Sequence, residues 1–234
     1  KTINEHLWLF DLLLAKLRED KSFKNDTSAE TFRVKQIKNQ TGKYQSFTFE
    51  EKDAIFNYFY KKNIHYARFL LFQYYTCIRP GESTRIHIEY IDLNNRTIFV
   101  PWYSSKNGLS NFVQILEPLY KVLKEMDLDR YQPSDYLFGR ENFVPGPIKK
   151  SEKNLSTPFH EACLELGIYD KQMYGLKGTF NKDYVENNKA NVDWEWLRRH
   201  NRHATVRQTQ DYISGLTAYF LNENEHTILD HTKK

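Results

Sequence analysis

Residues Tyr66 to Cys77 constrain the fold more than any other segment of the chain. Their sequence, YARFLLFQYYTC, is apolar on nearly every side of a helix. Such a helix has no polar face for solvent, so it must lie at the centre of a core with other elements around it. Pro80 and Gly81 then break the helical pattern. We therefore expect Arg79 at the end of a buried helix.

The chain is expected to divide near Tyr44 into a short leading part and one main domain. Between Ile3 and Arg18 apolar residues recur at helical spacing, which predicts one amphipathic helix. Residues 19–46 are polar and lack periodicity, which indicates a linker. A length of 234 residues allows one substantial domain plus an appendage. We therefore predict a helix and linker over residues 1–44 and a main domain over residues 45–234.

Two further patterns predict that the main domain is largely helical. Thr48, followed three residues later by Glu51, forms a capping box that begins a helix running to about Lys62. After Pro118 helical patterns return and continue to about Leu221, apart from one loop rich in proline and glycine.

Between these helical regions the period changes to that of β-strands. Short turns rich in asparagine and glycine separate the segments, which predicts a small antiparallel sheet. The expected strands are Ile88–Leu93, Thr97–Pro101 and Asn111–Ile115. The fold class that follows is α+β, mainly α, with a small antiparallel sheet.

Composition excludes several classes of protein. Hydrophobic residues make up 40% and charged residues 27% of the chain, which is ordinary for a folded domain. No apolar run approaches the ~20 residues of a membrane span, and the N-terminus has no signal-peptide pattern. The two cysteines, Cys77 and Cys163, lie in apolar surroundings and predict free buried thiols in a reducing cytoplasm. The net charge of +4 is compatible with a polyanionic partner but decides nothing by itself.

The common catalytic signatures are absent, since the sequence has no P-loop, no nucleotide-binding glycine pattern, no HExxH and no nucleophile-elbow serine. We predict neither a cofactor nor a metal site. Three segments do concentrate chemically capable side chains beside apolar ones. They are Cys77–Glu82, Tyr174–Phe180 and His203–Tyr212.

In these segments, from about Phe47 to Ser214, the chain resembles the tyrosine recombinases, also called phage integrases. In CIRPGE, Arg79 matches the family's first catalytic arginine, with Gly-Glu two to three residues on. In SSKNG, Lys106 lies in the turn between two predicted strands and matches the family's β-hairpin lysine.

The later segments match two further family motifs. In YGLKGTF, Tyr174 and Lys177 fall on the His-x-x-Arg box, with tyrosine for the usual histidine and lysine for the second arginine. HATVRQTQDYI is similar to the family pattern His-Ser-Ser-x-x-x-Thr-x-x-Tyr. It places His203 nine residues before the expected nucleophile, Tyr212.

The resemblance implies site-specific DNA recombination through a covalent phosphotyrosyl link to the DNA 3′ end. Arg79 is suited to bind phosphate oxygens with its planar fork. Lys106 would supply a proton to the departing oxygen. His203 would bind a non-bridging oxygen or help Tyr212 lose its proton.

The resemblance also implies partners and a setting for the reaction. The expected partner is double-stranded DNA, bound by a tetramer of the chain and without a membrane. The expected process is integration or excision of a mobile element, in the cytoplasm at the nucleoid. Residues 1–44 would be the C-terminal helix of a truncated core-binding domain plus a linker.

The lysine at residue 177, in place of the family's second arginine, leaves other functions possible. Lysine retains the charge of arginine but loses its two-pronged geometry, and losing one such donor costs on the order of a hundredfold in rate. A weakly active or inactive DNA-binding protein of the same fold is the main alternative, and a type IB topoisomerase is another. Arg198, Arg199 or Arg202 could compensate if the fold brings one of them to the phosphate.

Overall fold

The computed structural model describes residues 45–105, 108–153 and 155–213, together with Leu9, Phe10, Leu12, Leu13 and Lys16. The structure divides into two units between Lys43 and Tyr44. The helix and linker predicted for residues 1–44 lie almost entirely outside the described residues, so their assignment to a core-binding domain remains a prediction.

The first two helices of the second unit begin at side-chain caps. Helix α3 (Phe49–Lys62) starts with the predicted capping box. The Glu51 amide donates to the Thr48 hydroxyl at 3.2 Å, and the Thr48 amide donates to the Glu51 carboxylate at 2.8 Å. Helix α4 (Ile64–Thr76) starts at Asn63, whose side chain accepts from the Tyr66 amide at 3.1 Å.

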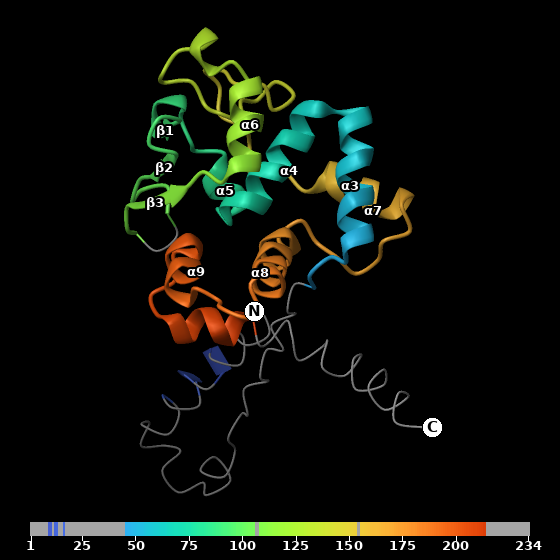
Figure 1. Ribbon diagram of the computed structural model, residues 1–234, viewed down its shortest axis with the longest axis vertical. Helices are drawn as coiled ribbons and strands as arrows, with labels where there is room; N and C mark the ends of the chain where they lie inside the picture. Colours follow the sequence, from blue (N-terminus) through green and yellow to red (C-terminus); the bar gives the residue numbers. More distant parts are fainter. Residues whose placement is uncertain are drawn as a thin grey trace, which may run out of the picture. The chain divides into compact units, whose positions relative to one another are not determined.

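Helix α4 occupies the centre of the domain, as its all-round apolar sequence predicts. It packs against α3, α6 (Glu117–Glu125) and α8 (Gly175–Asn187) (Figure 1). Phe69 and Phe72 are fully buried, and both rings meet Phe138 edge to face at 5.1 Å between centroids. The helix ends at Cys77, whose φ of 54° is left-handed. A single turn of helix, α5 (Pro80–Ser83), follows.

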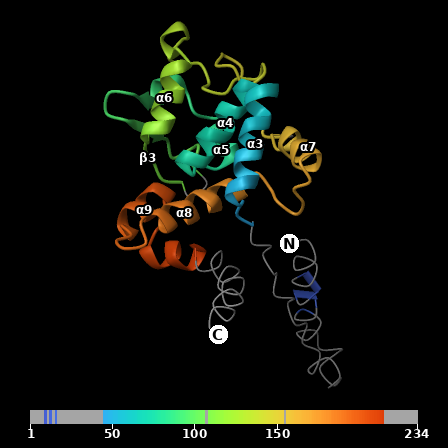
Figure 2. The same cartoon turned by 45° about the vertical axis from the view of Figure 1, so that its right-hand side comes forward.

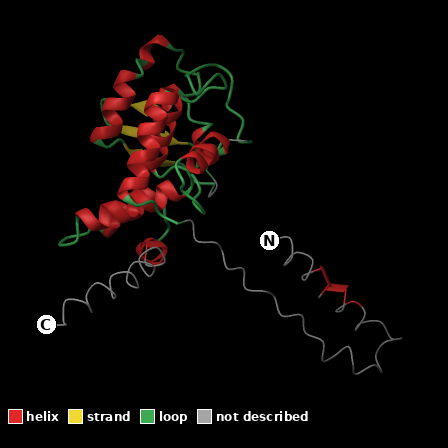
Figure 3. Cartoon of the chain, turned by 90° about the vertical axis from the view of Figure 1, so that its right-hand side faces the viewer, coloured by secondary structure: helices red, strands yellow, loops and turns green. Residues whose placement is uncertain are grey.

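The predicted sheet is confirmed, although its strands are shorter than expected (Figure 3). Strands β1 (Ile91–Asp92), β2 (Thr97–Val100) and β3 (Asn111–Gln114) pair antiparallel in chain order. Ile98, Val100 and Val113 face the core with no exposed surface, consistent with alternation along a half-buried sheet. Starting the first strand at Ile88 was wrong, because Ile88–Tyr90 forms a turn of 3-10 helix, η1.

The C-terminal half is less helical than predicted. Between residues 131 and 156 the described chain forms loops with isolated bridges, such as His87 with Tyr136 and Gly139 with Lys149. Proline and glycine are frequent in this stretch, which accounts for the lack of helix. The remaining elements are η2 (Leu128–Arg130), α7 (Thr157–Glu165), α9 (Trp194–Asn201) and a helical segment at 206–213.

These elements complete a mainly helical domain with a small antiparallel sheet, as predicted. Helix α7 packs on α3, and α9 packs on β3 (Figure 2). Both cysteines are free and buried. Among the described residues, no helix combines the length and apolar character that crossing a bilayer demands.

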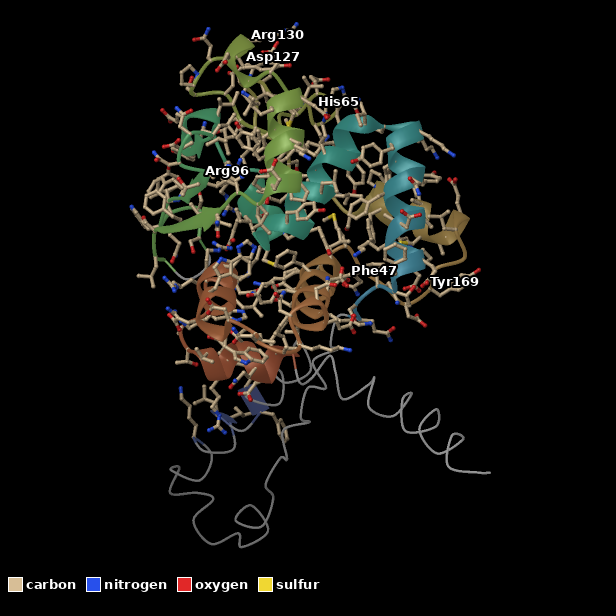
Figure 4. The ribbon with its side chains drawn as sticks, viewed as in Figure 1. Phe47, His65, Arg96, Asp127, Arg130 and Tyr169 are labelled. Atoms are coloured by element: carbon tan, nitrogen blue, oxygen red, sulfur yellow. The ribbon has the colours of Figure 1, made fainter. Side chains whose placement is uncertain are left out.

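The chain enters the domain across the first turn of α8. Phe47 lies between the start of α3 and α8 (Figure 4), and its amide donates to the Thr179 hydroxyl at 2.8 Å. At Gly175 the backbones approach so closely that a Cβ atom would lie 2.4 Å from the Gln45 carbonyl oxygen. The entry segment is therefore fixed to α8 by a contact that admits no side chain.

Replacing Gly175 by alanine is expected to destabilise the domain by about 1–3 kcal/mol, because a backbone oxygen cannot rotate out of the way as a side chain could. Urea unfolding followed by circular dichroism measures the change. Gly146→Ala is the control, since its Cβ would meet nothing within 4 Å, and it should stay within about 0.5 kcal/mol of wild type. Equal midpoints for all three proteins would contradict the close approach.

Candidate active site

Arg79 reaches the site from the turn that ends α4. The left-handed residue Cys77 stops the helix, and Arg79 then serves as the N-cap of α5. Its amide donates to Glu82 Oε2 at 3.3 Å, and its Nη1 donates to Glu82 Oε1 at 2.9 Å. The Arg79 side chain is 26% exposed, whereas that of Glu82 is 4% exposed. Glu82 therefore orients Arg79 and leaves part of its side chain accessible.

The same carboxylate pairs with a second arginine, Arg202. This residue ends α9 in a left-handed conformation, with φ 57°, and its Nη2 donates to Glu82 Oε2. The Arg202 side chain is 2% exposed. Its Nε and Nη1 are buried without a hydrogen-bond partner. Glu82 thus holds two guanidinium groups, and one of them retains unused donors.

Lys177 lies on α8 and is buried. Its Nζ donates to the Asn201 carbonyl at 3.3 Å, next to Arg202. The Asn181 side chain also donates to that of Asn201, at 3.1 Å. Burial lowers the pKa of Lys177 to about 8, the Cys77 thiol raises it, and the charges of Arg202 and Arg79 lower it. Lys177 therefore holds the end of α9 in place.

Tyr174 precedes α8 and lies beside Arg79. Burial lowers the pKa of Arg79, but Glu82 and Tyr174 raise it, and the net shift is upward. Arg79 is thus oriented by Glu82 on its own helix and lies close to the start of α8.

His203 directly follows Arg202 and contacts the predicted nucleophile. Its Nδ1 lies 2.9 Å from the Thr209 hydroxyl, and its ring meets that of Tyr212 edge to face at 5.9 Å between centroids. Burial, followed by the charges of Lys177, Arg79 and Arg202, lowers the pKa of His203 to about 3. The imidazole is therefore neutral near pH 7. The hydroxyl oxygen of Tyr212 is buried.

The structure brings five of the six predicted site residues into one neighbourhood. They are Arg79, Tyr174, Lys177, His203 and Tyr212. The sixth, Lys106, lies outside the described residues, in the connection between β2 and β3.

The sequence did not distinguish Arg202 from its neighbours, and the structure does. Arg198 pairs with Glu195 and donates to the His203 carbonyl at 2.8 Å. Arg199 is exposed and also faces Glu195. Only Arg202 of the three joins Glu82. The one available signal was its position, directly before His203 and at the end of an amphipathic helix. Within the described residues, no group of three His, Cys, Asp or Glu could hold a metal ion.

Glu82→Gln should cost about 3–5 kcal/mol of stability, because it leaves a buried guanidinium without its carboxylate. Glu152→Gln is the matched control, since Glu152 pairs with Arg85 and Lys149 but is 42% exposed. That change should cost less than about 1 kcal/mol. Urea denaturation of both variants measures the difference, and equal losses would show that Glu82 is no more important than a surface carboxylate.

His200 provides a second, acid-sensitive support for the site. It is buried near the end of α9, with Nε2 2.9 Å from the Tyr75 carbonyl oxygen. Its ring stacks on those of Trp196 and Phe180. Burial lowers the pKa of His200 from 6.5 to about 4, although the hydrogen bond with Tyr75 opposes this shift.

Stability should therefore fall as the pH drops from 6.5 towards 4, because in this window the unfolded chain binds a proton that the folded chain does not. The lowered pKa of His203 adds to the same loss of stability at low pH. Each histidine adds at most about 1.4 kcal/mol per pH unit. His200→Gln should be less stable than wild type but should show a shallower loss between these pH values in urea titrations. A slope equal to that of wild type would exclude His200 as a cause.

Comparison with known proteins gives a consistent result. The model of the phage integrase family matches residues 45–217, and no curated protein sequence matches the chain. The structure of XerA recombinase aligns with a TM-score of 0.60 and 21% identity over 87% of this chain and 73% of that chain.

Two DNA complexes also align with the chain. A lambda integrase dimer bound to a COC′ core site gives a TM-score of 0.58 and 13% identity, over 86% of this chain and 58% of that one. The Tn1549 transposon integrase in complex with circular intermediate DNA gives a TM-score of 0.57 and 13% identity. That alignment covers 75% of this chain and 62% of the integrase chain. At such identities the likeness shows the fold alone, and the chain spans only part of each relative.

Proposed function

Because this chain belongs to the phage integrase family, we propose that it breaks and rejoins DNA strands with Tyr212 as the nucleophile. The observation that carries the proposal is the meeting of distant segments at one cationic site. Arg79 comes from the end of α4, Lys177 from α8, and His203 from the end of α9, where it contacts Tyr212.

The site suits a phosphodiester better than a neutral substrate. Arg79 has a partly exposed side chain whose guanidinium is oriented by Glu82, and a guanidinium binds phosphate oxygens well. The neutral His203 has one ring nitrogen at Thr209 and can use the other as a hydrogen-bond donor to a non-bridging oxygen. The donors are in place before the reaction, which is the condition under which they stabilise developing charge most.

In the proposed step, the Tyr212 oxygen attacks phosphorus and the bond from phosphorus to the 5′ oxygen breaks. The phenolic proton passes to solvent, and Lys106 donates a proton to the 5′ oxygen. The products are a 3′-phosphotyrosyl link and a free 5′ hydroxyl. Because the link retains the energy of the phosphodiester, attack by a 5′ hydroxyl rejoins the strand without an added energy source. The Tyr212 hydroxyl is buried in this structure, so the proposal requires it to move towards the phosphate.

The proposed substrate is double-stranded DNA, acted on by a tetramer during integration or excision of a mobile element in the cytoplasm, at the nucleoid. Of the three structures compared above, two are complexes with DNA, and one of these is the integrase of a transposon. The net charge of +4 is compatible with this partner. Residues 1–44 would then be the end of a domain that helps to hold the DNA.

One observation favours the alternative, a DNA-binding protein with weak or no catalysis. The Lys177 amine is engaged with the Asn201 carbonyl and is not directed to solvent. If no other group replaces the expected second arginine, cleavage would be slow.

Covalent capture of DNA separates the two functions. The protein is incubated with a library of nicked duplexes that carry a randomised segment, and protein–DNA adducts that survive detergent are sequenced. We expect wild type to yield adducts at a common sequence and Tyr212→Phe to yield none, because the phenylalanine ring has no nucleophilic oxygen.

Tyr169→Phe is the matched control, since Tyr169 is 67% exposed and has no role in the proposed step. It should form adducts as wild type does. Selection of a DNA sequence by wild type without any adduct would support the alternative.

A further inference from the structure

We infer that Arg202 supplies the second guanidinium of the phosphate-binding site and that Lys177, in the position where a second arginine was expected, positions it. The inference rests on the proposed function and identifies a residue of that site that no family motif assigned.

The Arg202 side chain carries buried donors that no protein group uses. It is 2% exposed, and only Nη2 is engaged, with Glu82. Nε and Nη1 are buried and lack partners. A buried donor without an acceptor destabilises the folded state, and buried polar groups in proteins nearly always have a partner, so two such nitrogens on one side chain need an explanation. A phosphate provides one, because its oxygens accept from the donors that Glu82 does not use.

Arg202 also lies in the right place, next to Arg79. Arg202 shares the Glu82 carboxylate with Arg79, so the two guanidinium groups lie on either side of one anchor. Its charge contributes to lowering the pKa of both Lys177 and His203. Arg202 therefore lies among the predicted site residues, and a planar guanidinium can bind Glu82 and a second anion at once.

The hydrogen bond of Lys177 accounts for a lysine at this position. Its Nζ donates to the carbonyl of Asn201, the residue directly before Arg202. Asn181 also holds Asn201, so two side chains of α8 fix the end of α9. With that end fixed, the left-handed backbone of Arg202 directs the side chain towards Glu82. A guanidinium from α9 thus replaces one from α8. Arg202 is covered in this structure, as is the Tyr212 hydroxyl, and both must be uncovered to reach one phosphate.

The test uses the DNA sequence recovered by covalent capture, with cleavage rates measured under single turnover. Arg202→Gly removes the guanidinium and suits the left-handed backbone. We expect its rate to fall about 100-fold or more, the usual cost of one preorganised donor. Arg202→Lys keeps the charge beside Glu82 but lacks the planar fork that can bind Glu82 on one side and a phosphate on the other, so its cleavage rate should fall at least about tenfold.

Arg96→Gly is the matched control. Arg96 also has a left-handed backbone, with φ 53°, and it lies in the turn between β1 and β2 (Figure 4). It pairs with Glu117 and is 44% exposed. The cleavage rate of this variant should stay within about twofold of the wild-type rate, because an exposed ion pair contributes little to the stability of the fold.

A methylphosphonate at the cleaved position distinguishes contact with phosphate from a purely structural role. This group lacks the negative charge, so a guanidinium that neutralises the charge becomes less important. The ratio of the wild-type cleavage rate to that of Arg202→Gly should therefore be at least about tenfold smaller on the methylphosphonate than on the phosphate substrate. A loss without recovery would mean that Arg202 only supports the fold, and wild-type rates for both Arg202 variants would mean that it has no role; either result overturns the inference. If wild type forms no adduct with any DNA, the proposed function fails, and this inference fails with it.

Discussion

The buried carboxylate of Glu82 is the interaction on which the other parts of the site depend. It binds Arg79 on its own short helix and Arg202, which lies 120 residues further along the chain. A buried charge is tolerated only when it is paired and hydrogen-bonded. Removing either arginine would therefore weaken the pairing of the charges that stay buried. The ends of α4 and α9 are thereby fixed relative to each other, and α8 is fixed to α9 through Asn201.

Most of the fold could be predicted because its signals are local. The all-round apolar pattern of α4, the capping box at Thr48 and the alternation of Ile98 and Val100 each depend on neighbouring residues alone. The loops between residues 131 and 156 were predicted less well, because single bridges such as that of Gly139 with Lys149 leave no periodic pattern.

The site could be predicted only in part, for a physical reason. Arg79, His203 and Tyr212 lie in recognisable motifs, whereas the direction of Arg202 depends on a backbone conformation that residues other than glycine rarely adopt. No pattern of hydrophobicity encodes a left-handed residue at the end of a helix. The role of Lys177 was also hidden, because its partner is a main-chain carbonyl, and sequence motifs describe side chains.

The burial of Lys177 also links the stability of the domain to alkaline pH. In the folded chain the pKa of this amine is about 8, below its ordinary value of 10.5. Between these values the unfolded chain binds a proton that the folded chain does not, so this residue's contribution to stability rises with pH. At lower pH the charged amine is kept in the interior, at a cost that its hydrogen bond with the Asn201 carbonyl offsets only in part. The side chain that fixes the end of α9 is thus best suited to its buried position once it has lost its charge.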